Sequence, residues 1–329
     1  MKKKPFLLLL ISLFLSSFTG IEYGHSGKTE LQKIVSKRNI RIVVTDSGIG
    51  GLSVMSDIAD KISNSGSFKN VELIFVNALF DKGSGYNALQ TREVKIEVFN
   101  KALKGIKEGY KPDLIFVACN TLSVLIPDTP FVHQKKPPVI GIIEPGVELI
   151  LESLIENNDS DVIIFGTETT IDEQAHKEAL LKENINESRI ITKSCPQLQS
   201  YIEQDPMGEE TEMLISFYMN EALAEISHKD AVVNISLNCS HFGYSEQLWR
   251  KALVESGYPP GEILNPNNIM GDILITKNNI NRFSNTNIAF LVVSKVELVN
   301  VGSMVKIFED SSDGLVSALN NYKIIPNLF

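Results

Sequence analysis

The chain has 329 residues, with 31 Lys plus Arg against 40 Asp plus Glu, a formal net charge of -9 and 43% hydrophobic residues. This composition is typical of a globular protein long enough for two domains, and it excludes collagen-like, coiled-coil and disordered classes. The acidic balance argues against a nucleic-acid partner. Three cysteines are too few, and odd in number, for a disulfide framework.

The first twenty residues have the pattern of a secretory signal peptide. Lysines at positions 2, 3 and 4 precede the apolar run from Phe6 to Leu15, and small or hydroxyl residues follow up to Gly20. The apolar run is short for a membrane-spanning helix, but no clear cleavage site follows it, so an uncleaved membrane anchor stays open. We expect residues 1–20 to direct export, to the periplasm, with a membrane as partner only if they are retained.

From residue 39 the chain alternates short β-branched runs with longer helix-compatible segments, the pattern of a mostly parallel α/β sheet. Helices are predicted at residues 89–109 and 146–155, and a loop at 277–287 precedes the apolar run at 288–293. The predicted strands are residues 40–44, 71–76, 114–118, 139–143, 161–165, 189–192 and 231–237.

The first predicted strand runs into a glycine-rich turn, Asp46-Ser47-Gly48-Ile49-Gly50-Gly51. The turn permits close backbone approach by a ligand, although it matches neither the dinucleotide nor the Walker phosphate-binding motif. Asp46 either caps the following helix or binds a substrate ammonium and assists proton transfer, and the sequence alone leaves both roles open.

Two cysteines, Cys119 and Cys239, each follow a predicted buried strand and precede small polar residues. Ligands of open α/β sheets bind at the carboxyl ends of the strands, so the two thiols are candidates to face one cleft from two similar lobes. The alternative is that both are buried structural residues, the common fate of a free cysteine.

A facing thiol pair has a specific chemistry. One thiolate removes a proton from one face of a carbon while the other thiol returns a proton to the opposite face, which inverts the centre. Hydrogen bonds and positive charge from Asn120, Thr121, Ser240 and His241 would lower the thiol pKa. Proton transfer of this kind needs no cofactor, and no His or Cys spacing predicts a metal site.

Five ordered motifs resemble those of glutamate racemases, which belong to the cofactor-independent aspartate/glutamate racemase superfamily. The resemblance covers about residues 38–310. The motifs are Asp-Ser-Gly-Ile-Gly-Gly-Leu-Ser at 46–53, Ala-Cys-Asn-Thr at 118–121, Gly-Ile-Ile-Glu-Pro-Gly at 141–146, Gly-Thr-Glu-Thr-Thr-Ile at 166–171 and Asn-Cys-Ser-His at 238–241.

The resemblance implies two doubly wound α/β lobes related by pseudo-twofold symmetry, with the active site in the cleft between them. The first lobe would comprise residues 38–142 plus 251–329, and the second residues 143–250. The implied small-molecule partner is an amino acid, and a homodimer stays open. No cofactor is expected.

The resemblance also implies roles for individual residues. Cys119 matches the family cysteine that acts on the D-enantiomer and Cys239 the one that acts on the L-enantiomer, while His241 lies beside the second cysteine. Glu203 is a candidate assisting acid, and Cys195 is expected to be structural. The implied substrate-contacting residues are Asp46, Ser47, Asn120, Thr121 and Ser240.

The sequence departs from the family at two places. Gly83, Ser84 and Gly85 stand where the family has a Pro-Tyr-Gly turn that lines the pocket, and Asn238 and Ser240 flank the second cysteine in place of Gly and Thr. We therefore expect a racemase acting on glutamate or another acidic amino acid. Two alternatives stay open: an exported amino-acid-binding protein without turnover, and a related decarboxylase or isomerase.

Overall fold

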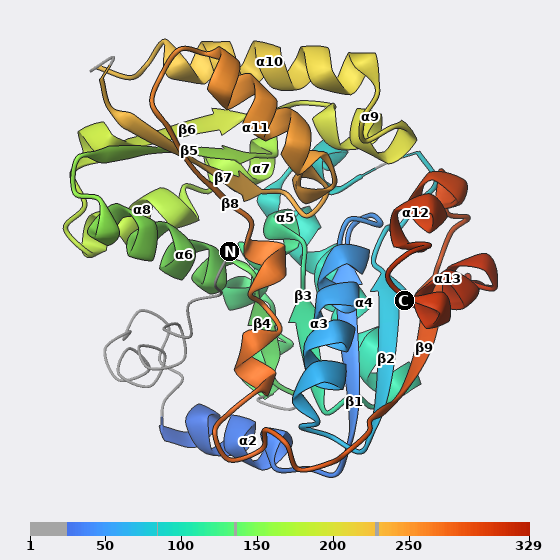
Figure 1. Ribbon diagram of the computed structural model, residues 1–329. Helices are drawn as coiled ribbons and strands as arrows, with labels where there is room; N and C mark the ends of the chain where they lie inside the picture. The colour runs from blue at the N-terminus through green and yellow to red at the C-terminus, as the bar shows by residue number, and fades with distance from the viewer. Residues whose placement is uncertain (1–24, 84, 135–136, 228–229) are drawn as a thin grey trace.

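The computed structural model describes residues 25–83, 85–134, 137–227 and 230–329. Within them are two separate sheets of parallel strands, one in the upper and one in the lower half of Figure 1. The predicted signal peptide lies outside these residues. No described helix has the length and apolarity needed to cross a bilayer.

The first sheet contains six strands within the described residues, and every observed pairing in it is parallel. Its spatial order is β10-β9-β2-β1-β3-β4. The strands are β1 (Asn39–Asp46), β2 (Asn70–Asn77), β3 (Leu114–Val117), β4 (Val139–Gly141), β9 (Asn287–Ser294) and β10 (Lys323–Ile324).

The second sheet has four described strands, also all parallel, in the order β6-β5-β7-β8. All seven residues of its inner strand β5 are buried, which explains why its sequence is a nearly continuous apolar run instead of an alternating one. The strands are β5 (Ser160–Gly166), β6 (Ile190–Ser194), β7 (Val232–Asn238) and β8 (Pro260–Leu264).

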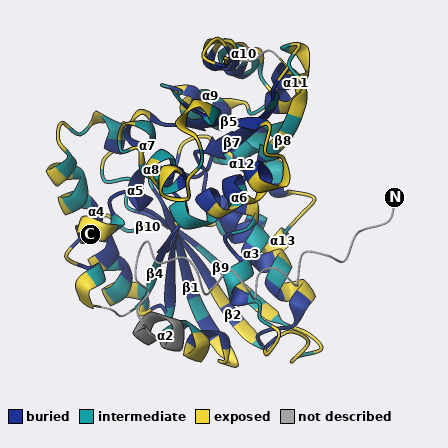
Figure 2. Ribbon diagram, turned by 90° about the vertical axis from the view of Figure 1, so that its left-hand side faces the viewer, coloured by how far each residue is buried: buried dark blue, intermediate teal, exposed yellow. Residues whose placement is uncertain are grey.

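Helices cover both faces of each sheet, so that the buried strands lie between layers with exposed outer surfaces (Figure 2). Alternate residues of β1 face opposite ways: Ile42 packs in the apolar cluster with α3, α12 and α13, while Val43 packs in the cluster with α4. In the second lobe α9, α10 and α11 cover one face and α6 and α8 cover the other. The helices are α2 (His25–Val35), α3 (Leu52–Ser65), α4 (Arg92–Tyr110), α5 (Asn120–Ser123), α6 (Ile143–Glu156), α7 (Glu168–Asp172), α8 (Ala175–Lys182), α9 (Leu198–Gln204), α10 (Glu209–Leu223), α11 (Glu246–Glu255), α12 (Val301–Phe308) and α13 (Asp313–Asn320).

The seven strands predicted between residues 40 and 237 are all present as β1 to β7, and the predicted α/β fold is confirmed. The two predicted helices are also present, as α4 and α6. The apolar run at 288–293 forms β9 and returns the C-terminal segment to the first sheet.

The boundary between the lobes differs from the expected one. The resemblance implied that residues 251–329 belong to the first lobe, but β8 at residues 260–264 pairs with β7 and completes the second sheet. The reason is local: α11 packs its apolar face on the second lobe, and a turn through Gly257, whose φ is 80°, directs the chain into the neighbouring strand. The chain re-enters the first lobe only after Leu264.

Candidate active site

The candidate site lies where the strand order reverses in each sheet. In the first sheet β1 has β2 on one side and β3 on the other, and in the second sheet β5 lies between β6 and β7. Crevices at the carboxyl ends of such strand pairs are the usual ligand sites of open α/β sheets. Asp46 ends β1, and Cys119 follows β3 by two residues, while Cys239 directly follows β7.

Both thiols line a single cavity of about 100 Å³, to which the two lobes contribute. Cys119 is 5% exposed and Cys239 is 6% exposed, so the cavity is largely shielded from bulk solvent. Its lining residues are Asp46, Ser47, Gly48, Gly85, Tyr86, Asn87, Cys119, Asn120, Thr121, Thr167, Gln199, Glu203, Cys239, Ser240 and His241.

Cys119 lies on the first-lobe side of the cavity, next to Ser47. The Ser47 Oγ and Cys119 Sγ atoms are 3.1 Å apart. Burial and the negative charge of Asp46 raise the pKa of the Cys119 thiol to about 12, an effect that hydrogen bonding from Ser47 only partly offsets. Without a ligand Cys119 is therefore a neutral thiol at physiological pH.

Cys239 has a different neighbour, a buried imidazole held by a carboxylate. The His241 Nδ1 atom lies 3.8 Å from the Cys239 sulfur, and Nε2 lies 2.6 Å from Glu203 Oε1. Burial alone lowers the pKa of His241, but the Glu203 carboxylate and Cys239 outweigh it, so the pKa lies well above its ordinary value. An imidazolium ion beside the sulfur is the electrostatic partner that a thiolate requires.

Asp46 is 1% exposed, at the bottom of the glycine-rich turn. Its Oδ1 accepts a hydrogen bond of 3.1 Å from the Gly48 amide, whereas Oδ2 has no hydrogen-bond partner among the described residues. Burial raises the pKa of this carboxyl, and the charge of His241 and the hydroxyl of Ser240 offset part of the effect. An unpaired buried carboxylate oxygen at a cavity is suited to receive a cationic group.

The turn after β1 brings the two lobes into direct contact. A Cβ atom on Gly50 would lie 2.4 Å from Ser240 Oγ and 2.7 Å from His241 Nδ1, so the contact requires glycine at this position. Tyr244 also donates a hydrogen bond of 3.0 Å to the Gly50 carbonyl. Gly50, whose turn was predicted to permit close approach by a ligand, thus packs against the second cysteine motif of the other lobe.

The two residues that follow Cys119, Asn120 and Thr121, supply polar groups to the cavity. Asn120 is 2% exposed, and neither its Oδ1 nor its Nδ2 has a hydrogen-bond partner within the described part of the chain. Thr121 is linked across the lobes to Thr167, with 2.8 Å between the hydroxyl oxygens. Since buried polar groups without partners are costly, the Asn120 amide is available for a ligand.

The structure brings together most of the residues that the sequence singled out. Asp46, the two cysteines, Glu203 and His241 all line the cavity, as do the expected ligand contacts Ser47, Asn120, Thr121 and Ser240.

The turn that replaces Pro-Tyr-Gly is a partial exception. Gly85 lines the cavity, but Gly83 does not, because its positive φ of 85° turns the chain in an exposed segment where no atom comes within 4 Å of a Cβ position. Ser84 lies outside the described residues. Cys195 is fully buried in the apolar core of the second lobe and does not line the cavity.

Sequence reasoning missed several lining residues. Tyr86 and Asn87 belong to the short helix η1 (Tyr86–Ala88). Gln199 lies in the first turn of α9, two residues after Gln197, whose φ of 64° is left-handed. Thr167 had a usable signal, because it directly follows β5 as Cys239 directly follows β7. The positions of Tyr86, Asn87 and Gln199 depend instead on how segments far apart in the chain pack together.

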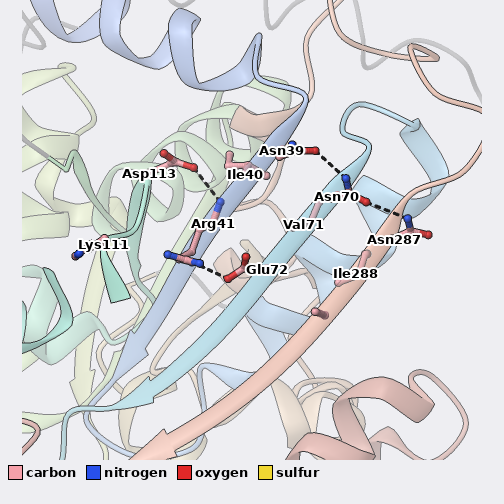
Figure 3. Close-up of a pocket in the computed structure, with 11 residues that line it drawn as sticks. Asn39, Ile40, Arg41, Asn70, Val71, Glu72, Lys111, Asp113, Asn287 and Ile288 are labelled. Atoms are coloured by element: carbon pink, nitrogen blue, oxygen red, sulfur yellow. Dashed lines mark hydrogen bonds and ion pairs between the residues drawn. The ribbon is translucent and has the colours of Figure 1, made fainter. Parts of the chain in front are cut away.

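A second groove, of about 450 Å³, lies at the opposite end of the first sheet, where β1, β2 and β9 begin (Figure 3). Its polar groups are bonded to one another: Asn39 accepts from Asn70, Asn70 accepts from Asn287, and Arg41 pairs with Glu72. It is larger than the interlobe cavity, but it contains no thiol or imidazole.

Comparisons with known proteins agree with this geometry. A glutamate racemase of Clostridium botulinum is 28% identical over 220 residues, 67% of this chain and 78% of the relative, and one of Aquifex aeolicus is 26% identical over 205 residues, 62% of this chain and 71% of the relative. No protein-family model matches the chain.

Solved structures show the same fold. The glutamate racemase of Francisella tularensis in complex with D-glutamate superposes with a TM-score of 0.64 at 19% identity, over 88% of this chain and 98% of that one. The Campylobacter jejuni glutamate racemase gives 0.62 at 19% identity, over 82% and 98%.

The relatives and the fold define the class of protein: an isomerase, an amino-acid racemase. More particularly, the chain is similar in sequence and in fold to glutamate racemases, which confirms the resemblance drawn from the five motifs.

Proposed function

We propose that the protein interconverts the enantiomers of an acidic amino acid, glutamate first among them, with Cys119 and Cys239 as opposing acid-base groups. The observation that carries the proposal is that both thiols line one small cavity between the lobes. The curated relatives are named glutamate racemases, and one related structure contains D-glutamate. The ligand of this chain would accordingly be a free amino acid.

In the proposed reaction one cysteine, as a thiolate, takes the Cα proton from one face of the substrate. The electron pair stays on the resulting planar carbanion, and the thiol of the other cysteine gives its proton to the opposite face. The product is the antipode, and the two sulfurs have exchanged protonation states. Following the resemblance, Cys119 acts on the D-enantiomer and Cys239 on the L-enantiomer.

Substrate binding would itself activate Cys119. The negative charge of Asp46 contributes to the raised pKa of Cys119, and Asp46 lines the cavity with an Oδ2 atom that has no hydrogen-bond partner among the described residues. A substrate ammonium bound there neutralises this charge, so the pKa of Cys119 falls when the substrate arrives. Asn120 supplies an amide donor that has no partner among the described residues, suited to the substrate carboxylate.

Cys239 would rely on a permanent partner instead. The His241 imidazolium, held by Glu203 at 2.6 Å, lies against the sulfur on the second-lobe side. We assign to His241 and Glu203 the role of holding a positive charge beside Cys239 and orienting its proton. The two bases are therefore tuned by different means.

Isotope exchange tests the proposal. Pure protein incubated in deuterated water with D-glutamate or L-glutamate should give the antipode with deuterium at Cα. Cys195→Ser is the matched control, because Cys195 is a buried thiol outside the cavity, and it should retain this activity. Binding of amino acids without exchange would instead indicate a binding protein, and the enzyme proposal would fail.

Residues 1–20 support a separate proposal, that the protein is exported. They carry the lysine cluster and apolar run of a signal peptide. In an oxidising compartment free thiols are at risk of oxidation, and the burial of Cys119 and Cys239 in a small cavity would limit that risk.

A further inference from the structure

The charged side chains that line the cavity are Asp46, Glu203 and His241, and no Lys or Arg is among the described lining residues. An acidic substrate has a second carboxylate besides the one at Cα. This group needs hydrogen-bond donors, because an unpaired carboxylate in a closed cavity is costly. Because both ring nitrogens of His241 already contact Cys239 and Glu203, we expect its partner to be a neutral donor, or a donor connected to a cation outside the cavity wall.

Asn87 is such a donor. It lines the cavity from η1, and its Oδ1 lies 2.6 Å from the Thr169 hydroxyl. Among the described residues none accepts a hydrogen bond from its Nδ2, so this end of the amide is available to a ligand.

A lysine fixes the orientation of this amide. Lys95 Nζ lies 2.7 Å from Thr169 Oγ1, and an ammonium group can only donate. The Thr169 hydroxyl therefore accepts from Lys95 and donates its own proton to Asn87 Oδ1. This leaves the Nδ2 hydrogens of Asn87 directed away from Thr169.

The arrangement crosses the two lobes. Lys95 on α4 and Asn87 on η1 belong to the first lobe, whereas Thr169 is buried on α7 of the second, with 6% of its surface exposed. Among the described residues no carboxylate lies within ion-pair distance of Lys95. The charge of Lys95 therefore polarises the Thr169–Asn87 hydrogen bond instead of being neutralised locally.

We propose that Asn87 is a specificity-determining residue, whose Nδ2 binds the side-chain carboxylate of the substrate, and that Lys95 and Thr169 are its positioning residues. The inference rests on the proposed racemase function and names the residues that would select an amino acid with a carboxylate side chain. Because Thr169 comes from the other lobe, the contact is complete only when the lobes are together.

The test compares glutamate with norvaline, a neutral amino acid with the same number of carbons. In the Asn87→Asp variant the donor becomes a repelling carboxylate, and the ratio of kcat/KM for glutamate over norvaline should fall by about 10- to 100-fold. The loss should appear in KM for glutamate, with kcat changed much less, because the contact is remote from Cα.

Two matched pairs separate positioning from a structural role. Thr169→Val should lower the same ratio by about 3- to 10-fold, and Thr169→Ser, which keeps the hydroxyl, should restore it. Lys95→Met should likewise lower the ratio, whereas Lys101→Met, on the same helix and paired with exposed Glu97, should not. Equal losses for glutamate and norvaline, or identical Val and Ser variants at Thr169, would overturn the inference.

Calorimetry with glutamate on the same variants keeps this inference distinct from the proposed function. If no amino acid is racemised but Asn87→Asp still weakens glutamate binding more than norvaline binding, the racemase proposal fails and the contact stands. If racemisation proceeds with an unchanged substrate preference in Asn87→Asp, the racemase proposal stands and the contact is refuted.

Discussion

The pair formed by His241 and Glu203 makes a quantitative prediction about stability and pH. The 2.6 Å contact joins side chains that are 6% and 17% exposed, so water screens it little. Glu203→Gln keeps the shape and one hydrogen bond but removes the charge. A charge-assisted hydrogen bond contributes about 1.5–3 kcal/mol and breaking a buried pair costs about 3–5 kcal/mol, so we expect a loss of about 2–3 kcal/mol.

The sign of the pH dependence follows from the raised pKa of His241. A group whose folded pKa exceeds its unfolded value, about 6.5 for His, stabilises the fold fully below that value and loses this contribution as the pH rises through the folded pKa. The difference in unfolding free energy between wild type and Glu203→Gln should therefore be largest near pH 6 and smaller at pH 9.

Urea denaturation at the two pH values measures this difference. Glu212→Gln serves as the control, because its partner Lys251 is exposed and a surface pair contributes at most about 1 kcal/mol. The loss of unfolding free energy in Glu203→Gln could prove no larger than in Glu212→Gln, or the same at pH 6 and pH 9. Either result would refute the claim that His241 is a charged imidazolium paired with Glu203.

Two further predictions concern the glycine-rich turn and the leader. Gly50→Ala places a Cβ 2.4 Å from Ser240 Oγ and should lower kcat/KM by about 100-fold, since misplacement of catalytic groups by about 1 Å has this effect. The control is Gly109→Ala on α4, where a Cβ meets no neighbour, and this variant should instead raise stability by about 0.5–1 kcal/mol. Equal activity of the two variants would contradict the close approach of Gly50 to Ser240. Mass spectrometry of protein from the exported fraction should find chains without residues 1–20, and recovery of the full-length chain from the cytoplasm alone would contradict export.

The strands could be predicted because residues buried on both faces form short apolar runs that stand out from the helices between them. β8 could not, since it begins with Pro260 and Gly261 and only its last residue, Leu264, is buried. Its place in the second sheet depends on pairing with β7. The two-residue β10 contains too few residues for any pattern.

The residues of the candidate site also divide into those that the sequence predicted and those that it could not predict. Residues at or just beyond the carboxyl ends of strands, such as Asp46 and Cys119, could be predicted because these ends converge in parallel sheets. Asn87 on η1 and Gln199 in the first turn of α9 follow left-handed residues, Gly83 and Gln197, and their positions depend on these turns and on contacts between lobes. Gly83 was expected in the pocket from the resemblance, but the chain reaches the cavity only two residues later.

The most direct test of the two-thiol account is Cα-proton exchange in the separate variants Cys119→Ser and Cys239→Ser. Each variant should lose racemisation in both directions yet retain slow exchange with only one enantiomer, because the remaining thiol reaches only one face of the carbon. The two variants should exchange opposite enantiomers. Two-way racemisation in either variant, or exchange of the same enantiomer by both, would contradict the assignment of Cys119 and Cys239 as opposing bases.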